Sequence, residues 1–171
     1  MRQYADGAMD DVTDDQMIET AGPFYKYAQG YAREVALACM TPRQNNGQEP
    51  PPAIAQMMLK SDVIFIITSK SLSHTQARRR ASDKGARIAS MPGATRDMIV
   101  RTLCADHQSI KRTGERLAAI VSRASQVRIT TKAGTDLSFS VKDRRALPDH
   151  GIIHSKGGFT NLPAGEVYVA P

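Results

Sequence analysis

A polar turn directly after the most apolar segment of the chain is the first place where chemistry could occur. Residues 63–68 read VIFIIT, and Lys70, Ser71, Ser73 and His74 follow at once. In open parallel sheets, ligands bind outside the carboxyl ends of the strands. Hydroxyl groups, a lysine and the amino terminus of a following helix would suit an anion such as phosphate or carboxylate. These four residues are therefore predicted to bind substrate, although the two serines could instead cap the helix.

Glu166 is the second candidate, a carboxylate between a Pro/Gly turn and a short apolar run. The segment reads NLPAGEVYVAP and begins at residue 161. A carboxylate fixed on a rigid backbone is what a divalent metal or a catalytic step needs. The spacing also allows a solvated surface glutamate, so the residues themselves leave both interpretations open.

Two histidines have the spacing of metal ligands but stand in the wrong kind of segment. His150 and His154 are separated by Gly-Ile-Ile. Glycine and β-branched residues favour an extended chain, in which the two imidazoles would lie about 13 Å apart, too far for one metal ion. Cys39 and Cys104 form no paired motif. We interpret them as small core residues of a protein from a reducing, cytoplasmic compartment.

Basic residues are concentrated in the middle of the chain. Of 171 residues, 23 are basic and 17 acidic, a net charge of +6, and residues 61–128 hold 13 basic and 5 acidic side chains. Such an excess occurs in proteins that bind nucleic acid or anionic substrates, and also on solvated helix faces. Aromatic residues make up only 5%, which argues against stacking on bases. No apolar run approaches the ~20 residues of a membrane helix, so we expect neither nucleic acid nor a membrane as a partner.

The elements that would position these residues alternate between strands and helices. Helical periodicity predicts a first helix from about residue 14 to 31, with a kink at Gly22-Pro23. Apolar runs predict buried strands at residues 34–40, 63–68 and 87–90, and further helices are predicted at about 52–60, 74–84, 95–103 and 106–124. This order favours a three-layer α/β fold, a mostly parallel sheet with flanking helices.

A predicted β-hairpin interrupts this alternation. Residues 126–131 and 136–141 alternate apolar and polar side chains around a short glycine-containing turn. The segment after it holds only short apolar runs. We therefore expect an amino-terminal α/β domain over residues 13–125, followed by the start of a second, incomplete β-containing lobe over residues 126–171.

Four segments, taken in order, resemble one family. They are GQEPPPAIAQMML, SDVIFIITSKSLSHTQARRRASDKGARIASMPG, TTKAGTDLSFSV and GGFTNLPAGEVYVAP. Together they resemble the aminopeptidase T group of leucyl aminopeptidases, which are metal-dependent exopeptidases, from about Thr13 to Pro171. In that family a run like NLPAGEV contains a metal-binding glutamate, and the matching position here is Glu166.

The resemblance implies a metal-dependent aminopeptidase, which releases amino-terminal residues from peptides with metal-activated water. It further implies two divalent ions (zinc, cobalt or magnesium), a peptide substrate, and a homodimer for the complete enzyme. The family's other ligands follow the glutamate run, whereas this sequence stops at Pro171. On this basis we expect an amino-terminal part that is inactive alone, with Glu166 as a metal ligand and no catalytic residue assigned.

Two alternatives remain. Related sequences include iron-dependent, ring-cleaving dioxygenases that act on dihydroxypyridines, whose ligands would likewise lie beyond Pro171. The other alternative is a small-molecule anion-binding α/β module that uses the turn at residues 69–74. That module would lack the glycines of the usual phosphate and dinucleotide loops.

Overall fold

The structure is a computed structural model that describes residues 14–170. Residue 13, where the first predicted domain begins, lies outside these residues. The chain divides into two compact units, one of Met1–Cys104 with Ile153–Pro163 and one of Ala105–Ile152 with Ala164–Pro171. The predicted boundary at residue 126 falls inside the second unit and stays a prediction about domains.

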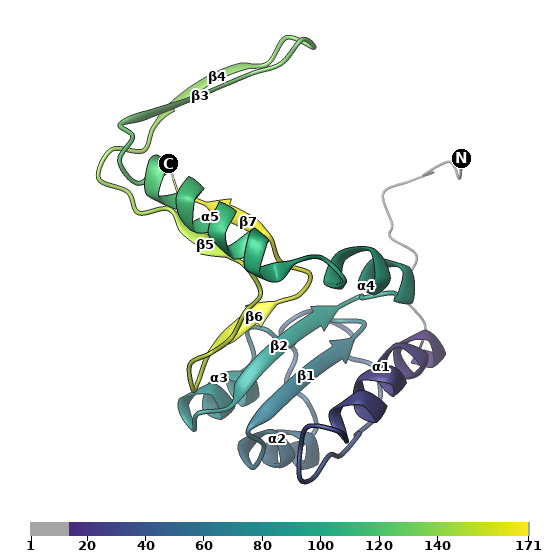
Figure 1. The fold of residues 1–171 in the computed structure, drawn as a ribbon. Helices are drawn as coiled ribbons and strands as arrows, with labels where there is room; N and C mark the ends of the chain where they lie inside the picture. Colours follow the sequence, from purple (N-terminus) through teal and green to yellow (C-terminus); the bar gives the residue numbers. More distant parts are fainter. Residues whose placement is uncertain (1–13, 171) are drawn as a thin grey trace. The chain divides into compact units, whose positions relative to one another are not determined.

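A three-stranded parallel sheet forms the centre of the first unit (Figure 1). Its strands are β1 (Val63–Thr68), β2 (Arg87–Pro92) and β6 (Phe159–Asn161), in the order β1-β2-β6. β1 pairs with β2 over its whole length, while β6 adds a short third strand beside β2. Helices flank this sheet on both faces, so the α/β fold class predicted from the sequence is confirmed.

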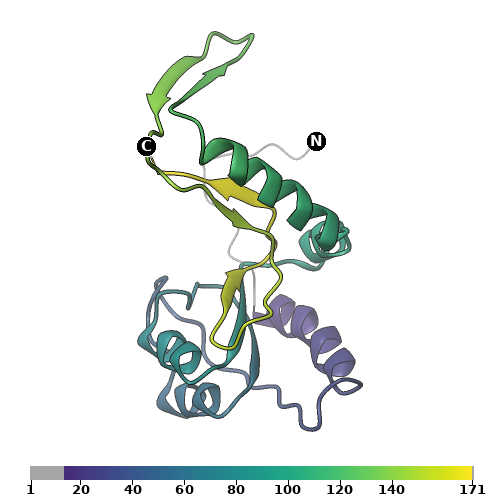
Figure 2. The ribbon, with the colours of Figure 1, turned by 60° about the vertical axis from the view of Figure 1, so that its left-hand side comes forward.

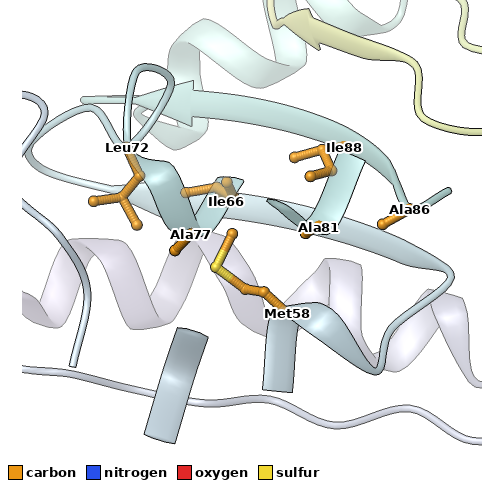
Figure 3. Packing of buried hydrophobic residues seen from close by; sticks show 7 residues of the cluster. All are labelled: Met58, Ile66, Leu72, Ala77, Ala81, Ala86 and Ile88. Carbon is orange, nitrogen blue, oxygen red and sulfur yellow. The ribbon is translucent and has the colours of Figure 1, made fainter. Parts of the chain in front are cut away.

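The core lies on one face of this sheet. There, α2 (Pro52–Leu59) and α3 (Gln76–Asp83) pack on the even-numbered side chains of β1 and β2. Figure 3 shows the cluster, in which Ile66 and Ile88 meet the two helices. Its members are Met58, Ile66, Leu72, Ala77, Ala81, Ala86 and Ile88. The alanines of α3 matter because small side chains let the helix approach the sheet closely.

The other face of the sheet is covered by α1 (Asp14–Ala28). Successive side chains of a strand point to opposite faces, and Phe65 points away from the core cluster. Its ring lies 5.5 Å from that of Phe24 on α1, between centroids. The helix continues through Pro23 as one element, and the kink at Gly22-Pro23 stays a prediction.

The sequence predicts a buried strand at residues 34–40, and the structure shows no strand there. They form no regular element, and Leu37 is 46% exposed. Their backbone makes no hydrogen bond to any segment that the structure describes, so no neighbouring strand holds them in the sheet. Short apolar runs are ambiguous in this way. Here only Met40 packs against the core cluster.

The second unit contains α5 (His107–Val121), the hairpin of β3 (Gln126–Thr130) and β4 (Asp136–Ser140), and the antiparallel pair of β5 (Leu147–Asp149) and β7 (Glu166–Tyr168). The predicted hairpin is confirmed. Figure 2 shows α5 lying along the β5–β7 pair. Gly114 lies at this contact: a Cβ there would be 3.6 Å from Pro148 Cβ and 3.8 Å from Val167 Cγ2, which are ordinary packing distances.

The remaining helix, α4 (Arg96–Leu103), starts at Thr95, whose side chain accepts a hydrogen bond from the Met98 backbone N–H. Among the residues that the structure describes, no helix is long and apolar enough to cross a membrane.

Candidate functional site

Two carboxylates face each other across the β5–β7 pair of the second unit. Asp149 and Glu166 are partners in the antiparallel register. Directly opposed residues point to the same face, with Cβ atoms about 4.5–5.5 Å apart. Like charges in such positions repel each other.

Both carboxylates line a half-open hollow of about 400 Å³ between α5 and the β5–β7 pair. A third acidic residue, Asp106, stands at the amino terminus of α5, where its Oδ1 accepts hydrogen bonds from Gln108 N (3.0 Å) and Ser109 N (3.1 Å). Apolar side chains and small polar residues complete the lining, with no basic side chain among them. The full set is Asp106, Ser109, Ile110, Thr113, Gly114, Leu117, Asp149, Gly165, Glu166 and Val167.

Backbone geometry fixes the approach of Glu166 to the hollow. Gly165 has φ of +144°, a conformation that residues with a side chain rarely adopt. A Cβ at Gly165 would lie 3.6 Å from Ile110 Cγ2 on α5. Across the pair, Asp149 Oδ1 accepts a hydrogen bond from Gly151 N at 3.2 Å. The Pro/Gly turn noted in the sequence thus places Glu166 among the residues that line the hollow.

Glu166 stays a predicted metal ligand. Among the residues that the structure describes, no group of three or more His, Cys, Asp or Glu side chains could hold a metal ion. His150 uses its Nδ1 to accept a hydrogen bond from Ile152 N at 3.2 Å, and His154 belongs to the other unit. Cys39 and Cys104 are exposed, so their prediction as core residues is wrong.

The four residues predicted to bind substrate lie in the turn after β1, in the first unit. Ser71 Oγ donates a hydrogen bond to Ser73 Oγ at 2.9 Å. Ser73 Oγ in turn lies 2.9 Å from Asn161 Oδ1 and 3.1 Å from Ser90 Oγ. Ser73 and Ser90 are buried, so this hydroxyl cluster ties the turn to the carboxyl ends of β2 and β6.

The other two residues of that turn differ from each other in their exposure to solvent. Lys70 is half-buried and His74 is exposed. The structure therefore brings Ser71 and Ser73 together in a structural network. It leaves His74 at the surface of the turn, where a solute can reach it.

A carboxylate of the chain itself caps the helix that follows this turn. Glu49 Oε1 accepts a hydrogen bond from Gln76 N at 2.5 Å, and Oε2 accepts one from Ala77 N at 3.1 Å. Thr75 accepts a further bond from Arg78 N at 3.2 Å. The amino terminus of α3 was the anion-binding feature of the module alternative, and Glu49 already neutralises it. Sequence reasoning missed Glu49 because this cap comes from a separate loop.

The loop that carries Glu49 also holds the turn by its backbone. Gly47 N donates a hydrogen bond to Ser71 O at 2.8 Å, and Ser71 N donates one to Asn46 Oδ1 at 2.8 Å. Two residues of this loop thereby fix the position of the turn. The sequence Asn-Asn-Gly predicts a turn in this loop. It does not indicate which segment of the chain the loop contacts.

Arg78, on α3, contacts the turn through its side chain. Its Nε donates a hydrogen bond to Ser73 O at 2.7 Å, and its guanidinium lies 4.5 Å from the centre of the Phe159 ring. Burial lowers the pKa of Arg78 from its usual value, and the neighbouring charge of Arg79 adds to this effect. The side chain is engaged in holding α3 against β6, which is a structural role.

Comparisons with known proteins assign the chain to a family. The family model of the NicX 2,5-dihydroxypyridine 5,6-dioxygenases matches residues 29–171. No curated protein matches the chain. Among solved structures, the 2,5-dihydroxypyridine dioxygenase from Pseudomonas putida KT2440 is similar, with 18% sequence identity and a TM-score of 0.54. The match covers 70% of this chain and 33% of that one, so the chain spans about a third of its length.

These findings correct the aminopeptidase interpretation. The expectation of a peptide-cleaving hydrolase is wrong, because the family that matches is one of dioxygenases, which are oxidoreductases. The segments that resembled the aminopeptidases form strands, turns and helix starts of the α/β framework, and a framework does not determine the reaction. The match spans most of the chain, from residue 29 to residue 171, and it shows that the chain belongs to the NicX family of 2,5-dihydroxypyridine 5,6-dioxygenases.

Proposed function

We propose that the chain forms part of a dioxygenase that opens the ring of a dihydroxypyridine with dioxygen. The observation that carries this proposal is the family match over residues 29–171, which extends through both units. The hollow of the second unit supports it. Its volume of about 400 Å³ lies in the range of small-molecule pockets.

The lining of the hollow suits an aromatic ring that carries hydroxyl groups. Ile110, Leu117 and Val167 offer apolar side chains to the faces of a ring. Asp149 and Glu166 offer carboxylate oxygens, which accept hydrogen bonds from hydroxyl groups. A dihydroxypyridine that enters the hollow would donate hydrogen bonds from its hydroxyl groups to the oxygens of Asp149 and Glu166. The repulsion between the two carboxylates would then fall.

A divalent metal fits this site only in part. Carboxylate oxygens are suitable ligands for divalent iron, manganese or magnesium, so we propose that Glu166, with Asp149 beside it, contributes to holding such an ion. A typical non-heme iron site takes two histidines and one carboxylate, and the described residues hold no such group of three. The carboxylate pair thus supplies part of a ligand set.

Lys70, Ser71, Ser73 and His74 remain a proposed polar binding surface in the first unit. Of these, His74 is exposed whereas Ser73 is buried in the hydroxyl cluster. His74 is therefore the residue whose replacement by alanine would test a direct contact with substrate.

Titration of the full chain with 2,5-dihydroxypyridine and, separately, with Mn²⁺ tests the role of the carboxylates. We expect amide resonances of Ile110, Leu117 and Val167 to shift with the pyridine, and Mn²⁺ to broaden resonances near Glu166. Glu166→Gln keeps the size of the side chain and removes the charge, so it should weaken both effects about tenfold, as for one charge-assisted interaction. Glu115→Gln is the matched control, because Glu115 is an exposed residue of α5 outside the hollow lining.

Two results would count against this assignment. If Glu166→Gln and Glu115→Gln bind Mn²⁺ and the pyridine as the unchanged chain does, the carboxylate pair has no binding role. If the pyridine shifts only resonances of residues 69–75, the substrate surface lies in the first unit instead.

A further inference from the structure

The residues of α5 that line the hollow form two stripes of different chemistry along the helix. Ile110, Gly114 and Leu117 form an apolar stripe. Ser109 and Thr113 stand one position before the first two of these residues and form a polar stripe beside it. Residues four positions apart on a helix are neighbours on one face, with Cβ atoms about 5–6 Å apart. The two hydroxyl groups are therefore close enough to contact adjoining atoms of one small ligand.

The hydroxyl groups of this polar stripe are available to a ligand. Ser109 and Thr113 are exposed, and neither hydroxyl has a hydrogen-bond partner among the residues that the structure describes. Asp106, which also lines the hollow, differs because its Oδ1 already accepts hydrogen bonds from two backbone amides of α5. The other lining residues are carboxylates, glycines and apolar residues. Ser109 and Thr113 therefore supply all the hydrogen-bond donors that the described side chains of the lining offer.

The β5–β7 side of the hollow has the complementary chemistry. Its polar side chains are those of Asp149 and Glu166, and an ionised carboxylate only accepts hydrogen bonds. A hydroxyl side chain, by contrast, both donates and accepts. The hollow thus has one side that only accepts hydrogen bonds and, on α5, one side that can also donate them.

A 2,5-dihydroxypyridine has two ends that match these two sides. Its 5-hydroxyl group donates a hydrogen bond, which a carboxylate accepts. At the other end the ring nitrogen adjoins the 2-hydroxyl group, and one proton is carried either by the oxygen or by the nitrogen. This end therefore always presents one donor beside one acceptor, and a pair of hydroxyl side chains can bind it in either form.

We propose that Ser109 and Thr113 recognise the nitrogen-containing edge of the ring and make the hollow prefer a dihydroxypyridine over a dihydroxybenzene. This inference rests on the function proposed above and adds the residues that select the ring. The 5-hydroxyl group then lies at Asp149 and Glu166, and the apolar stripe contacts the face of the ring. A benzene ring with the same two hydroxyl groups carries a C–H group in place of the nitrogen, so one hydrogen bond to the polar stripe is lost.

Titrations with two rings of the same outline test the proposal. The full chain is titrated without dioxygen with 2,5-dihydroxypyridine and with 1,4-dihydroxybenzene, and the amide resonances of the hollow lining are followed. The unchanged chain should bind the pyridine about three- to tenfold more tightly, the effect of one uncharged hydrogen bond. The double variant Ser109→Ala with Thr113→Val lacks both hydroxyl groups and should bind the two rings with equal affinity.

The matched control is the double variant Ser138→Ala with Thr130→Val. It makes the same two changes at exposed residues of the β3–β4 hairpin, outside the hollow lining, and should keep the preference of the unchanged chain. Comparing the two rings within each variant separates recognition of the nitrogen edge from a general loss of affinity. Far-ultraviolet circular dichroism confirms that each variant is folded. The single variants Ser109→Ala and Thr113→Val should each lose part of the preference, and they replace the double variant if it does not fold.

Two results would overturn this inference and leave the proposed function in place. One is equal affinity of the unchanged chain for the two rings. The other is a preference for the pyridine that persists without the hydroxyl groups of Ser109 and Thr113. If the pyridine shifts no resonance of the lining in the unchanged chain, the proposed function of the hollow is wrong, and the inference is wrong with it.

Discussion

Replacing Glu49 with alanine removes the carboxylate that caps α3 from a separate loop. The two hydrogen bonds from Gln76 N and Ala77 N are lost, while the cap by Thr75 remains. Loss of a capping side chain costs about 0.5–2 kcal/mol. Here two backbone donors lose a charged partner, and one of these bonds is half-buried. We therefore expect a loss of about 1–2 kcal/mol in the free energy of unfolding.

The assay is urea unfolding followed by circular dichroism, with thermal unfolding beside it. A loss of about 1–2 kcal/mol corresponds to a decrease in Tm of about 2–8 °C for a chain of this size. Glu49→Gln keeps one acceptor and should lose about half as much. The matched control is Glu115→Ala. Glu115 is 53% exposed and pairs with Lys111 at 3.8 Å, and such surface pairs contribute at most about 0.5 kcal/mol.

A second readout separates the cap from other effects. Removal of Glu49 opens the amino terminus of α3, so sulfate should raise the Tm of Glu49→Ala more than that of the unchanged chain. If Glu49→Ala unfolds at the same urea concentration as Glu115→Ala, the carboxylate does not stabilise α3 and the reasoning is refuted.

Two further predictions concern the backbone and the hairpin. Gly157→Ala should destabilise the chain by at least about 1–2 kcal/mol in urea unfolding, because φ is +77° and a Cβ would lie 2.8 Å from Ser82 O. Arg128 donates two hydrogen bonds of 2.8 Å to Asp136 and thereby lowers the pKa of that carboxyl below 3.8. The pKa of Asp136 is lower in the folded chain than in the unfolded chain. The pair therefore stabilises the folded state when the pH is above the pKa of the unfolded state. This stabilisation is lost as the pH falls through the pKa of the folded state. An NMR titration should show this pKa, and Arg128→Gln should return it toward 3.8; an unchanged pKa in that variant would contradict the assignment.

Local signals in the sequence predicted much of the framework. The run VIFIIT at residues 63–68 is apolar and β-branched, and it is β1. Thr95 and Gly85 mark helix ends by their own chemistry, as an N-cap side chain and a left-handed residue with φ of +104°. Such features depend on neighbours within a few residues, which is why pattern and propensity suffice for them.

The features that sequence reasoning missed depend on segments far apart in the chain. Residues 34–40 read like a buried strand, but a strand also needs a partner, and none of the described segments pairs with them. Residues 159–161 are too short for a strand signal, yet they pair with β2. The opposition of Asp149 and Glu166 follows from the β5–β7 register, which no local pattern encodes. Glu166 itself was found by its place after a Pro/Gly turn.

The reaction class was predicted wrongly from the sequence, and this error has a physical cause. The segments that resembled the aminopeptidases position strands, turns and one carboxylate. Peptidases and dioxygenases can share such a framework and differ in the groups that it carries. Only the match over residues 29–171 distinguished them.

A direct comparison of two ligands tests the central claim. The full chain is titrated with 2,5-dihydroxypyridine and with leucine amide, and the amide resonances of the hollow lining are followed. We expect the dihydroxypyridine to shift the resonances of Ile110, Leu117 and Val167, and leucine amide to leave them unchanged. Shifts with leucine amide, and none with the dihydroxypyridine, would contradict the assignment of this chain to dihydroxypyridine chemistry.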